Sequence, residues 1–114
     1  MNDIISIHKE LVRLSQSLAV AVNEFAGAAR EAAANRTDYD VKWAQAMLAA
    51  PDDVTQKIKE ALSTKQCASE MLAARVAEAN RDALKERIRA LETVLSVQQS
   101  RIRYLEFSEK HDTP

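Results

Sequence analysis

Residues that make turns and broad cores are scarce in this chain. Its 114 residues include one glycine, two prolines and only 4% aromatic residues. Tight hairpin turns need positive φ angles, which glycine supplies most easily, so the sequence offers few places for strands to reverse. The apolar 46% is mostly alanine, leucine, valine and isoleucine. This composition predicts an all-α fold of thin helical layers within a single domain.

Cysteine, charge and long apolar runs are limited as well. The single cysteine, Cys67, cannot form a disulfide within the chain. The net charge of −1, from 16 basic and 17 acidic residues, excludes the uniformly basic surface of a histone-like DNA-binding protein. The apolar stretch 4–22 is interrupted by a charged group at 8–13, so we expect no membrane span. Without a recognisable leader, the expected location is the cytoplasm.

Motifs for catalysis are also missing. His8 and His111 lie near opposite ends, with no ligand or triad partner at a suitable spacing. The one glycine, Gly27, cannot make a phosphate-binding loop, and its alanine-rich surroundings favour close helix packing over a bend. The acidic pair 52–53 suits a helix start better than a cation site. We therefore expect no enzyme, no cofactor and no metal.

Two heptad seams are the clearest positive signal. Apolar residues recur at alternating steps of three and four, a pattern that predicts helices covered by other helices. The first seam contains Ile4, Ile7, Leu11, Leu14, Leu18, Ala21, Phe25, Ala28 and Ala32. The second contains Leu84, Ile88, Leu91, Leu95, Gln98, Ile102 and Leu105. Because such stripes leave apolar surface exposed on a monomer, their large side chains are the predicted interface of a homo-oligomer, in a coiled coil or bundle.

Helix boundaries follow from local signals. We expect helices at about 3–34, 38–49 and 52–107, forming one domain over 1–107, and a flexible tail at 108–114. Residues 35–37 loosen the first helix, Thr37 and Asp40 resemble a capping box, and Pro51 ends the second helix. A division of the third helix near Ser63 and Thr64 is possible, but the absence of glycine and proline favours continuity. The apolar pattern slips by about one residue near 76–84, which suggests altered supercoiling or a change of packing partner there.

Basic and aromatic residues late in the chain form a candidate nucleic-acid site. Arg87 and Arg101 lie two heptads apart and face the same way, and Arg103 and Tyr104 follow. Such residues could contact phosphates and stack on an unpaired base. The alternative is that these charges, mixed with neighbouring glutamates, set partner choice and solubility beside the seam.

A second candidate lies earlier in the chain. Tyr39 and Trp43 share a helical face at a spacing of four, and Lys42 lies beside them. This face could stack on bases, but an aromatic anchor against the long helices, or an anchor in an oligomer interface, is the alternative.

The same residues carry a resemblance to a known family. The segment Tyr39-x-x-Lys42-Trp43, the segment Ile58–Ser63 and the late segment Ser100–Leu105 are similar to those of UvsY-like recombination mediators of phages. The resemblance covers about Tyr39 to Phe107. It implies a cytoplasmic helical oligomer that binds single-stranded DNA and helps to load a recombinase in place of single-strand-binding protein.

The resemblance also implies which residues bind DNA, with one departure. Lys42, Trp43 and Arg101 match the family's segments, but residues 44–50 carry no charge where the family has a basic stretch. The expected function is therefore a non-catalytic recombination mediator, in the host cytoplasm if a phage encodes it. A helical protein-interaction module without DNA binding, such as a scaffold, chaperone or inhibitor, is the alternative. The predicted DNA-binding residues are Lys42, Trp43, Arg87, Arg101, Arg103 and Tyr104.

Overall fold

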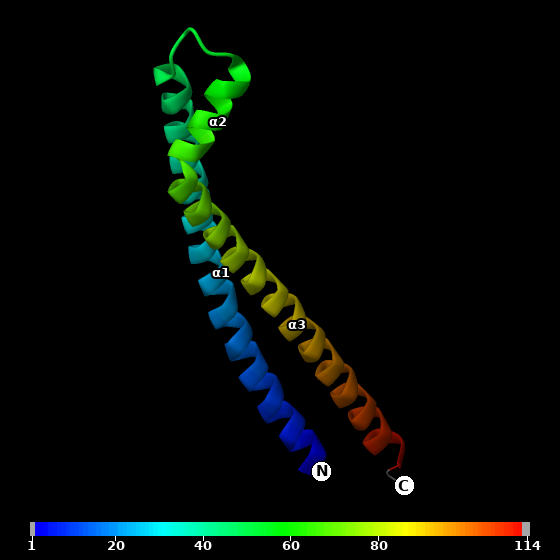
Figure 1. Ribbon diagram of the computed structural model, residues 1–114. Coiled ribbons are helices and arrows are strands. Elements are labelled where there is room, and N and C mark those ends of the chain that lie inside the picture. Colours follow the sequence, from blue (N-terminus) through cyan, green and yellow to red (C-terminus); the bar gives the residue numbers. More distant parts are fainter. Residues whose placement is uncertain (1, 113–114) are drawn as a thin grey trace. The chain divides into compact units, whose positions relative to one another are not determined.

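The computed structural model describes residues 2–112 and is built from three helices: α1 (Asn2–Ala49), α2 (Gln56–Gln66) and α3 (Ala68–Asp112) (Figure 1). No strand occurs in that range. The prediction of an all-α fold made of long helices is therefore confirmed. None of the described helices is long and apolar enough to cross a membrane.

The chain packs as two units, of which the first combines two segments that are distant in sequence and the second is one continuous range. The first unit takes in Met1–Phe25 and Ala83–Pro114, so the start of α1 pairs with the end of α3. The second unit takes in Ala26–Asp82, which includes the rest of α1, the whole of α2 and the start of α3. Each unit thus brings helices from both halves of the chain together.

The predicted seams are the faces along which the helices bury side chains. Every residue of both seams is buried or half-buried, with Ile7, Leu14 and Ile102 among the most enclosed in the first unit. Only α1 and α3 contribute to the described part of this unit, so the seam residues that it contains are covered by the other helix of the same chain. Ala28 and Ala32 of the first seam lie in the second unit. Whether these residues also make contacts between copies stays a prediction.

The buried side chains of the second unit are all small. They are Ala28, Ala32, Ala46, Ser63, Cys67 and Ala74. Small residues at a contact allow helix backbones to approach closely. Gly27 does not take part in such a contact, because a β-carbon placed there would meet no atom within 4 Å. The close-packing interpretation of Gly27 is therefore wrong, and its neighbouring alanines make the contact instead.

The expected break at 35–37 is absent, since α1 continues from Asn2 to Ala49. The side-chain amide of Asn35 donates to the backbone carbonyl of Glu31, 2.9 Å away, inside the helix. The next residue, Arg36, contacts Glu78 of α3. An N-terminal cap stabilises a helix start by only about 1 kcal/mol, so contacts with another helix can keep α1 continuous through this sequence. The separate helices predicted at 3–34 and 38–49 are one.

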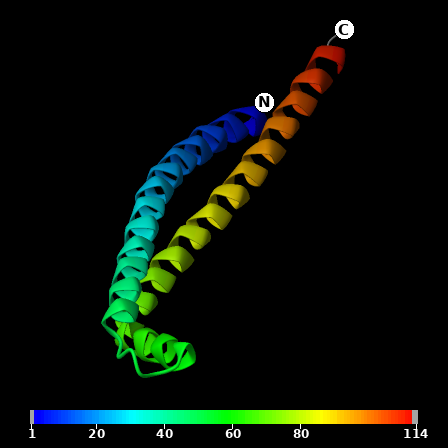
Figure 2. The same cartoon turned by 90° about the horizontal axis from the view of Figure 1, so that it is seen from above.

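The second and third helices also differ from expectation. The helix predicted from residue 52 begins at Gln56, because Thr55 is the N-cap and its hydroxyl accepts from the Ile58 amide at 3.3 Å. The favoured continuous helix is interrupted at Cys67, after which α3 takes a different direction from α2 (Figure 2). The backbone bonds Cys67 N to Ser63 O and Met71 N to Cys67 O persist, at 3.0 and 2.9 Å. The helices are divided at the buried Cys67, a few residues beyond the alternative division near Ser63 and Thr64.

Two further expectations for α3 are corrected. Residues 108–112, expected in a flexible tail, belong to the helix, while 113–114 lie outside the described residues. The slip near 76–84 is not present, because the enclosed positions alternate at steps of three and four through Cys67, Glu70, Ala74, Ala77, Arg81 and Leu84. Leu72 and Val76, which suggested the slip, are 65% and 60% exposed and lie on another face.

Candidate nucleic-acid interface

The residues predicted to bind DNA are divided between the two units. Arg87, Arg101, Arg103 and Tyr104 lie on the part of α3 that belongs to the first unit, whereas Lys42 and Trp43 lie on α1 in the second. The candidate site therefore has to be assessed one unit at a time.

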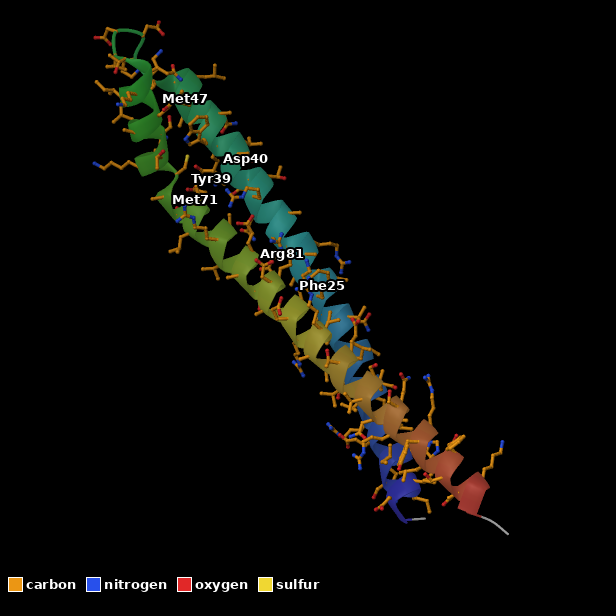
Figure 3. All side chains as sticks on the ribbon, turned by 90° about the vertical axis from the view of Figure 1, so that its right-hand side faces the viewer. Phe25, Tyr39, Asp40, Met47, Met71 and Arg81 are labelled. Atoms are coloured by element: carbon orange, nitrogen blue, oxygen red, sulfur yellow. The ribbon has the colours of Figure 1, made fainter. Side chains whose placement is uncertain are left out.

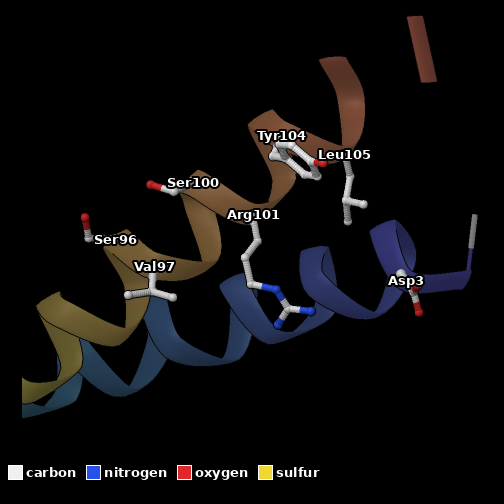
Figure 4. A pocket seen from close by; sticks show the side chains of 7 residues that line it. All are labelled: Asp3, Ser96, Val97, Ser100, Arg101, Tyr104 and Leu105. Carbon is white, nitrogen blue, oxygen red and sulfur yellow. The ribbon is translucent and has the colours of Figure 1, made fainter. Parts of the chain in front are cut away.

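In the first unit, a shallow groove brings Arg101 and Tyr104 together. Its volume is about 560 Å³, and the residues lining it are Asp3, Ser96, Val97, Ser100, Arg101, Tyr104 and Leu105. The Arg101 side chain leaves α3 and extends over α1, and Tyr104 lies one turn further along α3 (Figure 4). The spacing of three residues places both on one side of the helix. One strong cation and one aromatic ring thus share an open, mostly apolar groove.

The polar groups of this groove are available for a ligand. Arg101 donates from Nη1 to Oε1 of Gln98 at 3.1 Å, and it makes no ion pair with a carboxylate among the described side chains. The Tyr104 side chain is 70% exposed. Arg103 is also exposed and has no ion pair within the described residues, but it lines a separate hollow of α3 with Glu106, Phe107, Glu109 and Lys110 rather than this groove. Asp3 is the one carboxylate in the groove lining. Guanidinium groups without carboxylate partners keep their full capacity to bind phosphate.

Arg87 and Lys42 differ from Arg101, because carboxylates already contact them. Arg87 lies 4.0 Å from Glu24 of α1, at the limit of an ion pair. Lys42 lies 3.2 Å from Glu70 and 3.5 Å from Asp38. The hydrogen bond to Glu70, followed by the charge of Asp38, raises the pKa of the Lys42 ammonium. Both cations would have to exchange an internal partner for a phosphate.

The predicted aromatic face on α1 lies beside an ionic cluster that the sequence did not reveal. Tyr39 and Trp43 are half-buried. The Arg36 guanidinium lies 5.5 Å from the centre of the Tyr39 ring and binds Glu78 through two hydrogen bonds, of 3.2 and 2.6 Å. It also approaches the sulfur of Met71 at 3.9 Å, and Figure 3 shows Tyr39 and Met71 close together between α1 and α3.

This cluster ties the two helices together. The hydrogen bond between them raises the pKa of Arg36 and lowers that of Glu78. The spacing of three residues between Arg36 and Tyr39 was the one sign of this cluster in the sequence. The ion-pair partner of Arg36, Glu78, lies 42 positions away along the chain, so the sequence did not indicate it. The arrangement supports an anchoring role for Tyr39 rather than base stacking, because a cation already covers its ring.

Among the described residues, no group of three or more histidine, cysteine or acidic side chains is placed to hold an ion. Comparison of the chain with family models, with curated proteins and with solved structures finds no match.

Proposed function

We propose that this protein is a non-catalytic, homo-oligomeric recombination mediator of phage type, which binds single-stranded DNA through Arg101, Arg103 and Tyr104. The observation that carries the proposal is the groove where Arg101, without a carboxylate partner among the described residues, adjoins the exposed Tyr104 ring. The late segment Ser100–Leu105 that resembles UvsY-like mediators supplies most of this groove. Lys42, Trp43 and Arg87 are secondary contacts, since internal partners already occupy the two cations.

The groove suits an unpaired strand better than a duplex. Arginine binds phosphate without sequence preference, and an exposed ring can stack on any unpaired base. A chain with a net charge of −1 binds weakly through one such site. Repetition of the site across copies adds avidity without new contacts, so a homo-oligomer compensates for the weak single site. This proposal implies that the protein partners are the recombinase and single-strand-binding protein. It also implies that the protein acts in the host cytoplasm.

The test is an anisotropy titration of a labelled single strand and of its duplex, at low and at moderate salt. We expect tighter, salt-sensitive binding to the single strand. The double change Arg101→Glu with Arg103→Glu should weaken this binding by roughly tenfold or more, because two phosphate contacts become repulsive.

A matched control separates the site from general electrostatics. Arg13→Glu with Arg89→Glu makes the same charge change in the same unit, at arginines that already pair with Glu10 and Glu86. This control should retain most of the binding. Equal losses in both variants would remove the groove from the proposal, and no binding by the wild-type protein would overturn DNA binding itself.

A helical protein-interaction module is the second candidate. Large apolar side chains on both long helices are more than half exposed, and they include Ile5, Val12, Val20, Leu48, Leu72, Val76, Val97 and Phe107. Apolar surface of this extent is typical of helices that contact other proteins. An intact oligomer that does not bind DNA in the titration would favour this candidate.

A further inference from the structure

The short helix α2 is loosely packed against the rest of its unit. Its one enclosed side chain is Ser63, which is 1% exposed, while its two largest apolar side chains, Ile58 and Leu62, are each 47% exposed. A hollow of about 470 Å³ remains between α2 and the end of α1, with Leu62 and Ser63 on one side and Ala46 and Ala49 on the other. Burial of apolar side chains is the main force that holds one helix against another, and α2 contributes little of it.

Polar contacts do not hold α2 in place either. Among the described residues, no hydrogen bond or ion pair joins a side chain of α2 to α1 or α3. The Ser63 hydroxyl is closed off from solvent and has no hydrogen-bond partner among the described atoms, and burial of an unpaired hydroxyl costs free energy. By contrast, α3 is joined to α1 by the pairs Lys42–Glu70 and Arg36–Glu78. The ion pairs that join α1 to α3 therefore do not involve α2.

A single residue, Cys67, separates α2 from α3. Its backbone angles are φ −101° and ψ 19°, against about −63° and −42° in an α-helix. The hydrogen bonds from Cys67 N to Ser63 O and from Met71 N to Cys67 O are those of a continuous helix, and no glycine or proline occurs at 56–112. The connection 50–55 reaches up to about 20 Å, which exceeds the length of α2, about 16 Å. A change of the backbone angles at Cys67 is therefore sufficient to turn α2 into line with α3.

We propose that α2 is a hinged strap, which turns about Cys67 between an inward position beside the end of α1 and an outward position in line with α3. The inward position encloses Ser63 and Ala46, as the structure shows. The outward position hydrates the Ser63 hydroxyl, so the cost of burying it unpaired disappears, and it opens the side of α1 that faces the hollow. Because these opposed contributions are small, both positions are populated in solution. The strap lies in the second unit and does not depend on DNA binding.

The test is a distance measurement between two nitroxide spin labels, one on α1 at Ala44 and one on α2 at Lys57, which are both exposed. The labels are attached through p-acetylphenylalanine, so that Cys67 stays unchanged, and the labelled chains are diluted with unlabelled protein. Pulsed electron paramagnetic resonance on frozen samples should give two distances for this pair. A matched pair on α1 and α3, at Ala44 and Ala73, should give one distance, because ion pairs join these two helices.

Substitutions at Ser63 should shift the ratio of the two distances. Ser63→Ala removes the unpaired hydroxyl and should lower the ratio of outward to inward α2 by roughly fivefold or more, whereas Ser63→Glu should raise it, because the inward position would bury a carboxylate. The controls Thr64→Ala and Thr64→Glu alter the neighbouring exposed residue and should leave the ratio unchanged.

Three outcomes would overturn the inference. The first is a single distance between Ala44 and Lys57 without any change at Ser63. The second is a pair of distances whose ratio the substitutions at Ser63 shift no more than those at Thr64. The third is two distances between Ala44 and Ala73, because α3 rather than α2 would then move.

Discussion

The two units use different side chains to hold helices together. In the first unit, branched residues such as Ile7, Leu14 and Ile102 are almost fully enclosed. In the second, the enclosed residues are alanines with one serine and one cysteine, and the pairs Arg36–Glu78 and Lys42–Glu70 join α1 to α3. Burial of a leucine or isoleucine contributes about 2 kcal/mol, far more than burial of alanine.

The difference indicates that the stability of the fold and the alignment of α1 with α3 come from different units. Apolar seams are tolerant of a shift by one heptad, because each seven-residue step offers a similar face. A bidentate pair such as Arg36 with Glu78 fits only one alignment of the two helices. We infer that the first unit supplies most of the stabilising burial and that the second fixes which residues of α1 lie opposite which residues of α3.

The largest effect is expected from a cavity in the first unit. Leu14 is 3% exposed, and Leu14→Ala should lower the free energy of unfolding by about 3 kcal/mol. Urea denaturation measures the loss, and amide hydrogen exchange should show it in the first unit. The control Val20→Ala, at a 53% exposed position of the same helix, should change stability by less than about 0.5 kcal/mol. Similar losses in the two variants would contradict the assignment of the stabilising burial to the seam.

The seams could be predicted because their signal lies within each helix. Branched side chains at Ile4, Leu14 or Leu91 repeat at the helical period, and their burial follows from it. The helix ends could not be predicted as well. The break expected near Thr37 rested on a local cap, but Arg36 makes a contact 42 positions away that local patterns do not contain. The bend at Cys67 was missed because neither glycine nor proline marks it.

The candidate site was predictable only in part, for a similar reason. The sequence grouped Arg101 and Tyr104 near the end of the late helix, and the groove contains both. The sequence did not reveal that Asp3, from the other end of the chain, lines the same groove, or that Lys42 pairs with Glu70. Such partners depend on how α1 aligns with α3, which the repeating seams leave open.

A smaller effect is expected from overfilling the second unit. Ala74 is fully buried, whereas Ala73 beside it is exposed. Ala74→Leu forces extra volume between closely packed helices and should cost about 2 kcal/mol in urea denaturation. Ala73→Leu makes the same change on the open side and should be close to neutral. A neutral Ala74→Leu would mean that the helices of this unit are not closely packed.

The smallest effect concerns pH and the pair that aligns the helices. The Arg36 hydrogen bond holds the pKa of Glu78 below its ordinary value, so the folded protein binds a proton there less readily than the unfolded chain. The resulting stabilisation is complete above the unfolded pKa of about 4.3 and is lost as pH falls through the lowered folded value. The pKa of Glu70 is lowered as well, chiefly by the hydrogen bond from its own backbone N–H and then by those from the Ser69 hydroxyl and Lys42. Glu70 therefore stabilises the folded protein with the same pH dependence.

Glu78→Gln should therefore be slightly less stable than the wild-type protein near neutral pH and should approach it below the lowered pKa. Between about pH 5 and pH 3 the stability of the variant should fall less steeply than that of the wild-type protein. Urea is the appropriate denaturant, because guanidinium salt would screen the ion pair. The control Glu92→Gln, at an exposed position of α3 in the first unit without an ion pair to a described residue, should leave the pH dependence unchanged. Parallel pH profiles for wild type and Glu78→Gln would mean that the pair contributes no stability in solution, and the alignment of the helices would then have to come from the Lys42–Glu70 pair and the small side chains.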